Sequence, residues 1–226
     1  MTAWLPLFPL GTVLFPGLVL PLHIFEERYR ALVRDLLGAP EGAPRRFGVV
    51  AIKVGREVGA DGVAALYDVG CTAELHKVEA YTDGRYDIIT AGGVRFRLGG
   101  VEVDTRSQPY ACGEVEFLDE RAGERAEWLA ADVDAHFREY QHRLRTLQGE
   151  PPAEPVGLPR DPVGLSYLVA AAAILDLTDK QRLLSAPDAA ARLRLERSLL
   201  RRENAILEPL PSLPAVDLLR QGVTLN

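Results

Sequence analysis

Nucleophilic side chains are scarce in this sequence. It contains three lysines and five serines, which are Ser107, Ser166, Ser185, Ser198 and Ser212. No serine lies in a G-x-S-x-G nucleophile elbow and no local Ser-Lys signature occurs, although residues distant in sequence could still form a dyad. A G-x-x-x-x-G-K-[ST] phosphate loop is also missing, which argues against ATP hydrolysis. By motif, the sequence therefore encodes neither P-loop ATP hydrolysis nor proteolysis.

Metal-ligand patterns are equally sparse. Cys71 and Cys112 have no second cysteine pair near them, so neither a zinc site nor a CxxC redox motif is encoded. His136 and His142 lie six residues apart on an expected helix, whereas a helical metal pair needs i, i+4 spacing. We predict no metal and no cofactor, and we expect both cysteines to be small buried hydrophobic residues.

Three places could contact a binding partner. His23 stands where a strand should give way to a helix; it could contact a ligand or sense pH, although a hydrogen-bonded structural role is more common. The turn at Phe15 and Pro16 could expose an apolar tip, but closing a barrel is the favoured interpretation. Tyr81 and Tyr86 flank another turn, where they could bind a partner or pair across two strands.

A cluster of arginines near the end of the chain could contact phosphate. Glu196 and Glu203 lie among these arginines, and arginine also suits the C-terminal end of a helix. We therefore predict a solvated helix face, made of Arg192, Arg194, Arg197, Arg201 and Arg202.

The opening segment from Leu5 to Phe25 carries no charge. It is long enough for a membrane helix, but its four prolines and two glycines would interrupt the helical hydrogen bonds. No basic residue precedes Arg28 and no small-residue cleavage site follows, so a signal peptide is a poor match. We expect a cytoplasmic protein whose first segment is strand, turn, strand and then helix, with short strands at Leu5–Phe8, Val13–Phe15 and Leu18–Ile24.

Composition indicates a globular chain without a dedicated nucleic-acid surface. Hydrophobic residues make up 47% of the 226 residues, and the net charge is −6. This charge is spread evenly, because the parts before and after Leu118 each carry −3. A balanced, slightly acidic chain is a poor candidate for phosphate-backbone binding.

Strand patterns continue from Phe47 to Leu118. The phase of the apolar alternation slips at His76 and Lys77, which predicts a β-bulge. Asp83-Gly84 predicts a two-residue hairpin turn. We expect Val94, Phe96 and Leu98 to point inward and Arg95 and Arg97 outward. The glycine-punctuated strands indicate a small barrel, covered by a helix whose apolar stripe is Phe25, Tyr29, Leu32, Val33, Leu36 and Leu37.

Helical periodicity follows Asp119. One long helix is predicted by the apolar stripe of Leu129, Val133, Phe137, Tyr140, Leu144 and Leu147. A proline-rich stretch then ends at Asp161, which should cap an apolar helix over Pro162–Leu177. Capping residues at Thr178 and Ser185 predict two further helices.

Three blocks of the sequence resemble the Lon protease N-terminal domain family, also called the Lon substrate-binding domain. They are LPLFPLGTVLFPGLVLPLHIFEERY, GCTAELHKVEAYTDGRYDIITAGGVRFRL and DKQRLLSAPDAAARLRLERSLL. The resemblance covers residues 4 to 207. The chain is similar to free-standing members of the family, which lack the ATPase and peptidase. It implies an α+β fold: a twisted antiparallel β pseudo-barrel with PUA-like architecture over residues 1–118, a helical bundle over 119–208, and a tail over 209–226.

The same resemblance implies recognition of unfolded or apolar polypeptides. We expect a non-enzymatic polypeptide-binding module, an adaptor or chaperone-like protein of protein quality control, with a protease or chaperone as a further candidate partner. The alternatives are an RNA-binding PUA-like module and an enzyme with an unrecognised site. Because the barrel should offer an incompletely paired strand edge, we place the binding surface around Phe15, Pro16, His23, Tyr81 and Tyr86.

Overall fold

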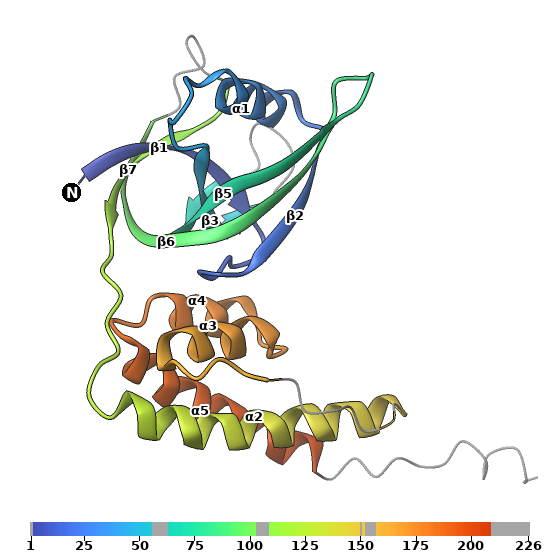
Figure 1. Cartoon of the computed structure of the whole chain (residues 1–226), viewed down its shortest axis with the longest axis vertical. Helices are drawn as coiled ribbons and strands as arrows, with labels where there is room; N and C mark the ends of the chain where they lie inside the picture. The colour runs from blue at the N-terminus through green and yellow to red at the C-terminus, as the bar shows by residue number, and fades with distance from the viewer. Residues whose placement is uncertain (1, 56–62, 103–108, 150, 152–156, 209–226) are drawn as a thin grey trace, which may run out of the picture.

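The chain folds into a β-rich part and a helical part that pack against each other (Figure 1). The computed structural model describes residues 2–55, 63–102, 109–149, 151 and 157–208. The tail predicted over 209–226 lies outside these residues. The β-rich part contains β1 (Thr2–Leu10), β2 (Val19–Ile24), α1 (Glu27–Gly38), β3 (Arg46–Gly55), β4 (Val63–Leu66), β5 (Val69–Ala80), β6 (Tyr86–Glu102) and β7 (Cys112–Phe117).

Five of these strands close into a ring. The hydrogen-bonded order is β1-β7-β6-β5-β3-β4, and β1 also pairs with β3. That last pairing is parallel, from Leu7 opposite Gly48 to Leu10 opposite Ala51. The expected antiparallel pseudo-barrel is confirmed, and its closing pair of β1 and β3 is the one parallel pair among the described strands. Val13–Phe15, which we expected to be a short strand, is instead an irregular connection between β1 and β2.

The long strand β6 has two successive neighbours along one edge. Its first half pairs with β2, from Ile24 opposite Tyr86 to Val19 opposite Ala91, and its second half pairs with β7. Its other edge pairs with β5. Within the part of the chain that the structure describes, β2 has a strand neighbour on the β6 side alone. The opposite edge of β2 is therefore a free sheet edge.

Strands β5 and β6 contain both the predicted β-bulge and the predicted hairpin. The register shifts between Leu75 and Lys77, which confirms the bulge at His76. The hairpin is also present, but its turn spans three residues, because Tyr81 N donates to Arg85 O at 2.9 Å and Gly84 N donates to Tyr81 O at 3.0 Å. Only Gly84 of the turn adopts a positive φ, so the two-residue turn is corrected to a three-residue one.

Helix α1 covers the barrel at the end opposite the helical part (Figure 1). Tyr29, Leu32, Val33 and Leu36 are buried in the barrel core, as the periodicity predicts. Phe25 does not belong to this stripe: the helix begins two residues later, and Phe25 is 51% exposed.

The helical part contains α2 (Ala126–Gln148), α3 (Pro162–Ala172), α4 (Leu177–Leu184) and α5 (Ala189–Leu207). The long apolar stripe of α2 packs against α3 and α5 as expected. The predicted cap of α3 is confirmed, since Asp161 accepts a hydrogen bond from Gly164 N.

Two helix boundaries differ from the predictions. Helix α3 ends at Ala172 instead of Leu177, because Asp176 accepts from Asp179 N at 2.7 Å and starts α4 there. The cap of α4 is thus Asp176 and not Thr178. The cap of α5 is Asp188, which accepts from Ala191 N, whereas Ser185 ends α4.

A mixed apolar and ionic junction joins the two parts. Its apolar portion brings Phe15 and Val69 of the barrel against Tyr167 and other residues of α3, α4 and α5. Arg95 of β6, predicted to point into solvent, is 1% exposed and lies in this junction. Helices cover the outer face of the sheet at this point, so alternating residues are buried on both faces.

The hydrogen bonds of Arg95 explain why a charge is tolerated there. Its guanidinium donates to Glu120 Oε1 at 2.6 Å and to the carbonyl oxygens of Leu184 and Ala186 at 2.6 and 2.7 Å. Tyr167 donates its hydroxyl hydrogen to the same Glu120 oxygen. A buried charge with this many partners fixes the barrel against the bundle.

Arg192 also departs from the predicted solvated face. Its side chain is fully buried, its guanidinium lies 3.7 Å from the Tyr167 ring centre, and its Nε donates to Ser166 Oγ at 2.8 Å. Glu196, one turn later on α5, is 1% exposed. The apolar surroundings raise the pKa of Glu196 well above its ordinary value.

Candidate functional site

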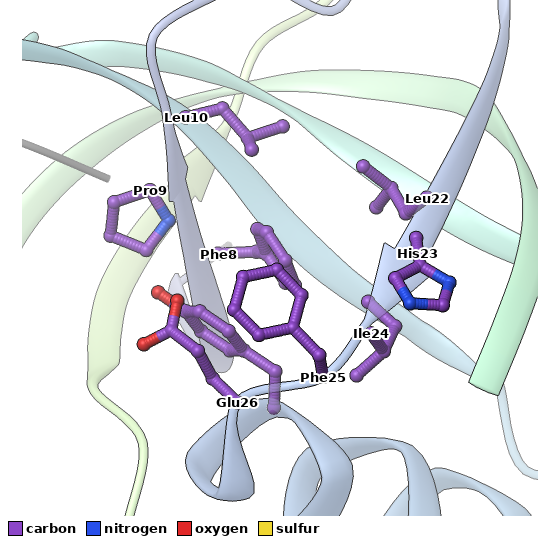
Figure 2. A pocket seen from close by; sticks show the side chains of 9 residues that line it. Phe8, Pro9, Leu10, Leu22, His23, Ile24, Phe25 and Glu26 are labelled. Carbon is purple, nitrogen blue, oxygen red and sulfur yellow. The ribbon is translucent and has the colours of Figure 1, made fainter. Parts of the chain in front are cut away.

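An open apolar groove lies at the α1 end of the barrel. It encloses about 160 Å³ and is lined by Phe8, Pro9, Leu10, Leu22, His23, Ile24, Phe25, Glu26 and Tyr29. Figure 2 shows the end of β1 on one side, the end of β2 on the other, and the start of α1 between them. No residue of β6 lines it, so the groove opens on the side of β2 that faces away from β6.

Local sequence explains why apolar side chains remain accessible here. The floor is a stack of Phe8 on Tyr29, with ring centres 4.0 Å apart. Phe25 follows the last residue of β2 and precedes the first turn of α1, where Tyr29 N and Arg30 N both donate to Glu26 O. This short connection leaves Phe25 at the mouth of the groove instead of in the core.

Two residues of the neighbouring hairpin hold His23, the polar side chain at the rim of the groove, without lining the groove themselves. Its Nδ1 lies 2.6 Å from Asp87 Oδ1, and Tyr81 donates its hydroxyl hydrogen to Asp87 Oδ2 at 2.5 Å. Hydrogen bonds from Tyr81 and His23 lower the pKa of Asp87, and the bond to Asp87 raises the pKa of Tyr81. The carboxylate is thus held in its charged form, with His23 Nδ1 as a donor.

The hairpin itself is tied to α1. Arg30 Nε donates to Gly84 O at 2.7 Å, and Arg85 pairs with Asp83 at 2.7 Å within the turn. Glu26 at the groove pairs with Arg28 at 3.0 Å. The walls of the groove are therefore fixed before any partner arrives.

The structure separates the five residues that we predicted to form one surface. His23 lines the groove and Tyr81 bonds to the same carboxylate at its rim. Tyr86 instead packs against the barrel core. Phe15 is 1% exposed and half-buried Pro16 follows it, so this turn closes the barrel against the bundle and presents no apolar tip.

Sequence reasoning missed most of the groove. Tyr29 was assigned to the buried stripe of the covering helix, which is confirmed, and Phe25 was assigned to the same stripe, which is wrong. An apolar side chain in a groove carries the same sequence signal as one in a core. The interruption of apolar periodicity between β2 and α1 was the one available hint.

The groove suits binding better than chemistry. Its lining is apolar apart from His23 and Glu26, each of which is already paired. Among the described residues, no group of three or more His, Cys, Asp or Glu side chains could hold a metal ion. None of the described helices is both long enough and apolar enough to cross a bilayer.

Comparison with known proteins shows the family of the chain. The family model of the ATP-dependent protease La (LON) substrate-binding domain matches residues 4–202. The chain belongs to this family. Its relatives among curated proteins include Lon protease 2 of Myxococcus xanthus, 29% identical over 90% of this chain, and Lon protease 2 of Sorangium cellulosum, 30% identical over 89%. The chain spans about a quarter of the length of these relatives.

Solved structures share the fold of this Lon substrate-binding domain. The Lon N-terminal domain protein from Xanthomonas campestris aligns with a TM-score of 0.56 at 22% identity, covering 92% of this chain and 99% of that one. The N-terminal domain of the Mycobacterium avium complex Lon protease aligns with a TM-score of 0.61 at 18% identity, covering 90% and 98%. The expected α+β architecture is thereby confirmed.

Proposed function

We propose that this Lon substrate-binding domain binds apolar side chains of unfolded polypeptides in the groove and catalyses no reaction itself. The observation that carries the proposal is the open apolar groove with Phe25 half exposed at its mouth. Pre-formed apolar concavities with a few polar groups at the rim are typical ligand sites. A substrate-binding family supplies the class of ligand, which is polypeptide.

The absence of catalysis is part of the same proposal. His23 is the one histidine in the groove lining, and its ring bonds to Asp87, with its other nitrogen 3.5 Å from Arg85 Nη1. Among the residues that the structure describes, no serine, cysteine, threonine or lysine lines the groove. The domain would therefore act as an adaptor that captures a chain for a protease or chaperone to process.

The proposal is tested with a fluorescent, end-blocked peptide, Ser-Leu-Ser-Phe-Ser-Leu-Ser. Phe25→Ser should weaken its binding about tenfold or more, because losing a buried aromatic anchor typically costs about 1.4 kcal/mol or more. Fluorescence anisotropy gives the affinity, and urea unfolding should show little change because Phe25 is exposed.

Ile174→Ser is the matched control, since Ile174 is 65% exposed on the helical part. It should leave peptide affinity unchanged. Equal affinities for the Phe25→Ser variant and the parent protein would refute the groove as the site. A steep fall of binding with added salt would instead indicate phosphate-type contacts and favour RNA, because apolar binding depends little on salt.

A further inference from the structure

We propose that the polypeptide held in the groove also pairs with the free edge of β2, where it forms an added β-strand. This inference rests on the proposed function, since it concerns the same groove and the same bound polypeptide, which we call the guest. It goes further because it assigns the main-chain contacts, the conformation of the guest and the pattern of side chains that the guest must have.

The backbone geometry of β2 shows which residues offer hydrogen bonds at the free edge. Gly92 N donates to Leu18 O at 2.8 Å, and the register continues with Leu20 opposite Thr90. In an antiparallel ladder the hydrogen-bonded residues alternate. Even-numbered residues of β2 therefore bond to β6, and the N–H and C=O groups of Val19, Pro21 and His23 point away from it.

The position of Pro21 agrees with this assignment. Pro21 lies opposite Ile89, in the middle of β2. Proline has no N–H and is confined to edge strands with that side facing solvent. A proline at an even-numbered position would break the ladder with β6, whereas at position 21 it faces the free edge.

Side chains of β2 alternate in the same way. Leu20 and Leu22 are half-buried and Ile24 is buried toward the core, while Val19 is 65% exposed and Pro21 and His23 are also exposed. A strand added at this edge would continue both rows. Alternate guest side chains would enter the groove, and those between them would lie on the outer face of the sheet.

The edge is held ready for such a guest. The bond between His23 and Asp87 fixes the end of β2 to β6, and α1 begins directly after Glu26. The free edge thus runs over about five residues and ends at a helix. A short extended segment with apolar residues at alternate positions fits it, whereas an amphipathic helix offers no unpaired main-chain groups.

The missing N–H of Pro21 limits the strength of this pairing. Val19 and His23 can each donate and accept, but Pro21 can only accept. The guest carbonyl that faces Pro21 therefore accepts its hydrogen bond from water instead. Replacing Pro21 by Ala supplies the missing donor, so the guest should bind about two- to tenfold more tightly.

An N-methyl scan of the peptide Ser-Leu-Ser-Phe-Ser-Leu-Ser tests the proposal with the complete chain. Methylation removes one main-chain donor at a time. In an added strand, only every second donor faces β2, so affinity should fall about tenfold or more at alternate residues and change little between them. An antiparallel guest loses affinity at its serines, and a parallel guest loses it at its leucines and phenylalanine. Losses without this alternation would overturn the proposal.

Pro21→Ala provides the second measurement, with Pro40→Ala, an exposed proline beyond the end of α1, as its control. Tighter peptide binding by Pro21→Ala alone supports strand addition, and unchanged affinity overturns it. These results separate the two proposals: binding that depends on Phe25 but not on N-methylation or Pro21 leaves the groove standing without the added strand. Binding that does not depend on Phe25 removes the groove itself.

Discussion

Two carboxylates in this molecule have similar partners and different surroundings. Asp87, at the groove rim, and Glu120, at the junction of barrel and bundle, each accept a tyrosine hydroxyl, from Tyr81 and Tyr167 respectively. Each also accepts from a nitrogen of a basic side chain at 2.6 Å. The Asp87 cluster is about half exposed, whereas the arginine that serves Glu120 is almost fully buried.

Burial decides what each cluster contributes. Water competes for the bonds of Asp87, so these bonds contribute little to the free energy of unfolding. At Glu120 the arginine has already lost its water, and removing one partner leaves a buried charge without compensation. The exposed cluster contributes little to stability, and the buried one fixes the orientation of the barrel against the bundle.

The largest effect is expected from Arg95→Met. This change removes the buried partner of Glu120 and leaves the carbonyl oxygens of Leu184 and Ala186 without their donor, so stability should fall by about 3 kcal/mol or more. Urea unfolding measures the loss. Arg97→Met, two residues along the same strand and exposed, should change stability by less than about 0.5 kcal/mol. Equal midpoints for the two variants would contradict a structural role for the junction.

A matched pair of amide substitutions tests the comparison directly. Glu120→Gln keeps the shape of the side chain but removes the charge that Arg95 faces, and should cost about 2 kcal/mol. Asp87→Asn makes the same chemical change at the exposed rim and should leave the thermal midpoint unchanged. Calorimetry of both variants in one buffer measures the two losses of stability. Similar losses would show that burial is not the controlling difference.

A gain of stability is expected from Glu196→Gln. Burial raises the pKa of Glu196, so the folded protein holds a proton that the unfolded chain releases. At a pH below the pKa of Glu196 in the unfolded chain, the protonated carboxyl contributes its full stability. This contribution is lost as the pH rises through the raised pKa of Glu196 in the folded protein. Glutamine cannot ionise, so the variant should be more stable by about 1 kcal/mol at pH 8 and should lose this advantage in acid.

Denaturant unfolding between pH 4 and pH 8 checks this prediction. Glu208→Gln is the control, because Glu208 lies at the end of the same helix with a side chain 73% exposed. A stability gain for Glu196→Gln that does not depend on pH would show that the carboxyl does not titrate as described.

The smallest effect is expected from Tyr81→Phe. The hydroxyl of Tyr81 is the largest contributor to the lowered pKa of Asp87, so its removal should raise that pKa toward the ordinary value. Carbon-13 NMR of the Asp87 carboxyl follows the titration. Tyr86→Phe should leave it unchanged, since Tyr86 packs against the core. An unshifted titration in Tyr81→Phe would mean that the hydrogen bond is not formed in solution.

Much of the fold could be predicted because local signals agreed with it. The bulge at His76, the hairpin at Asp83-Gly84 and the cap at Asp161 each reflect a backbone requirement that a few neighbouring residues satisfy. These features depend little on what packs against them. The three-residue turn shows the limit, since a glycine reveals that a positive φ is needed but not where strand pairing resumes.

The junction and the groove could not be predicted in the same way. Alternation along β6 assigns Arg95 to the face opposite Phe96, and that assignment is correct. What alternation cannot show is that helices from distant sequence cover this face. The exposure of Phe25 depends likewise on where α1 begins, which tertiary packing decides.

The proline in β2 has one more consequence, which concerns copies of this protein meeting one another. A free sheet edge beside apolar side chains can pair with the same edge of a second molecule. Proline on an edge strand is one of the ways in which proteins prevent such pairing. Pro21 denies an approaching copy of β2 a continuous ladder, because each molecule would bring the same gap. The edge that we propose for an added guest strand therefore also contains the residue that opposes its pairing with a second copy of this protein.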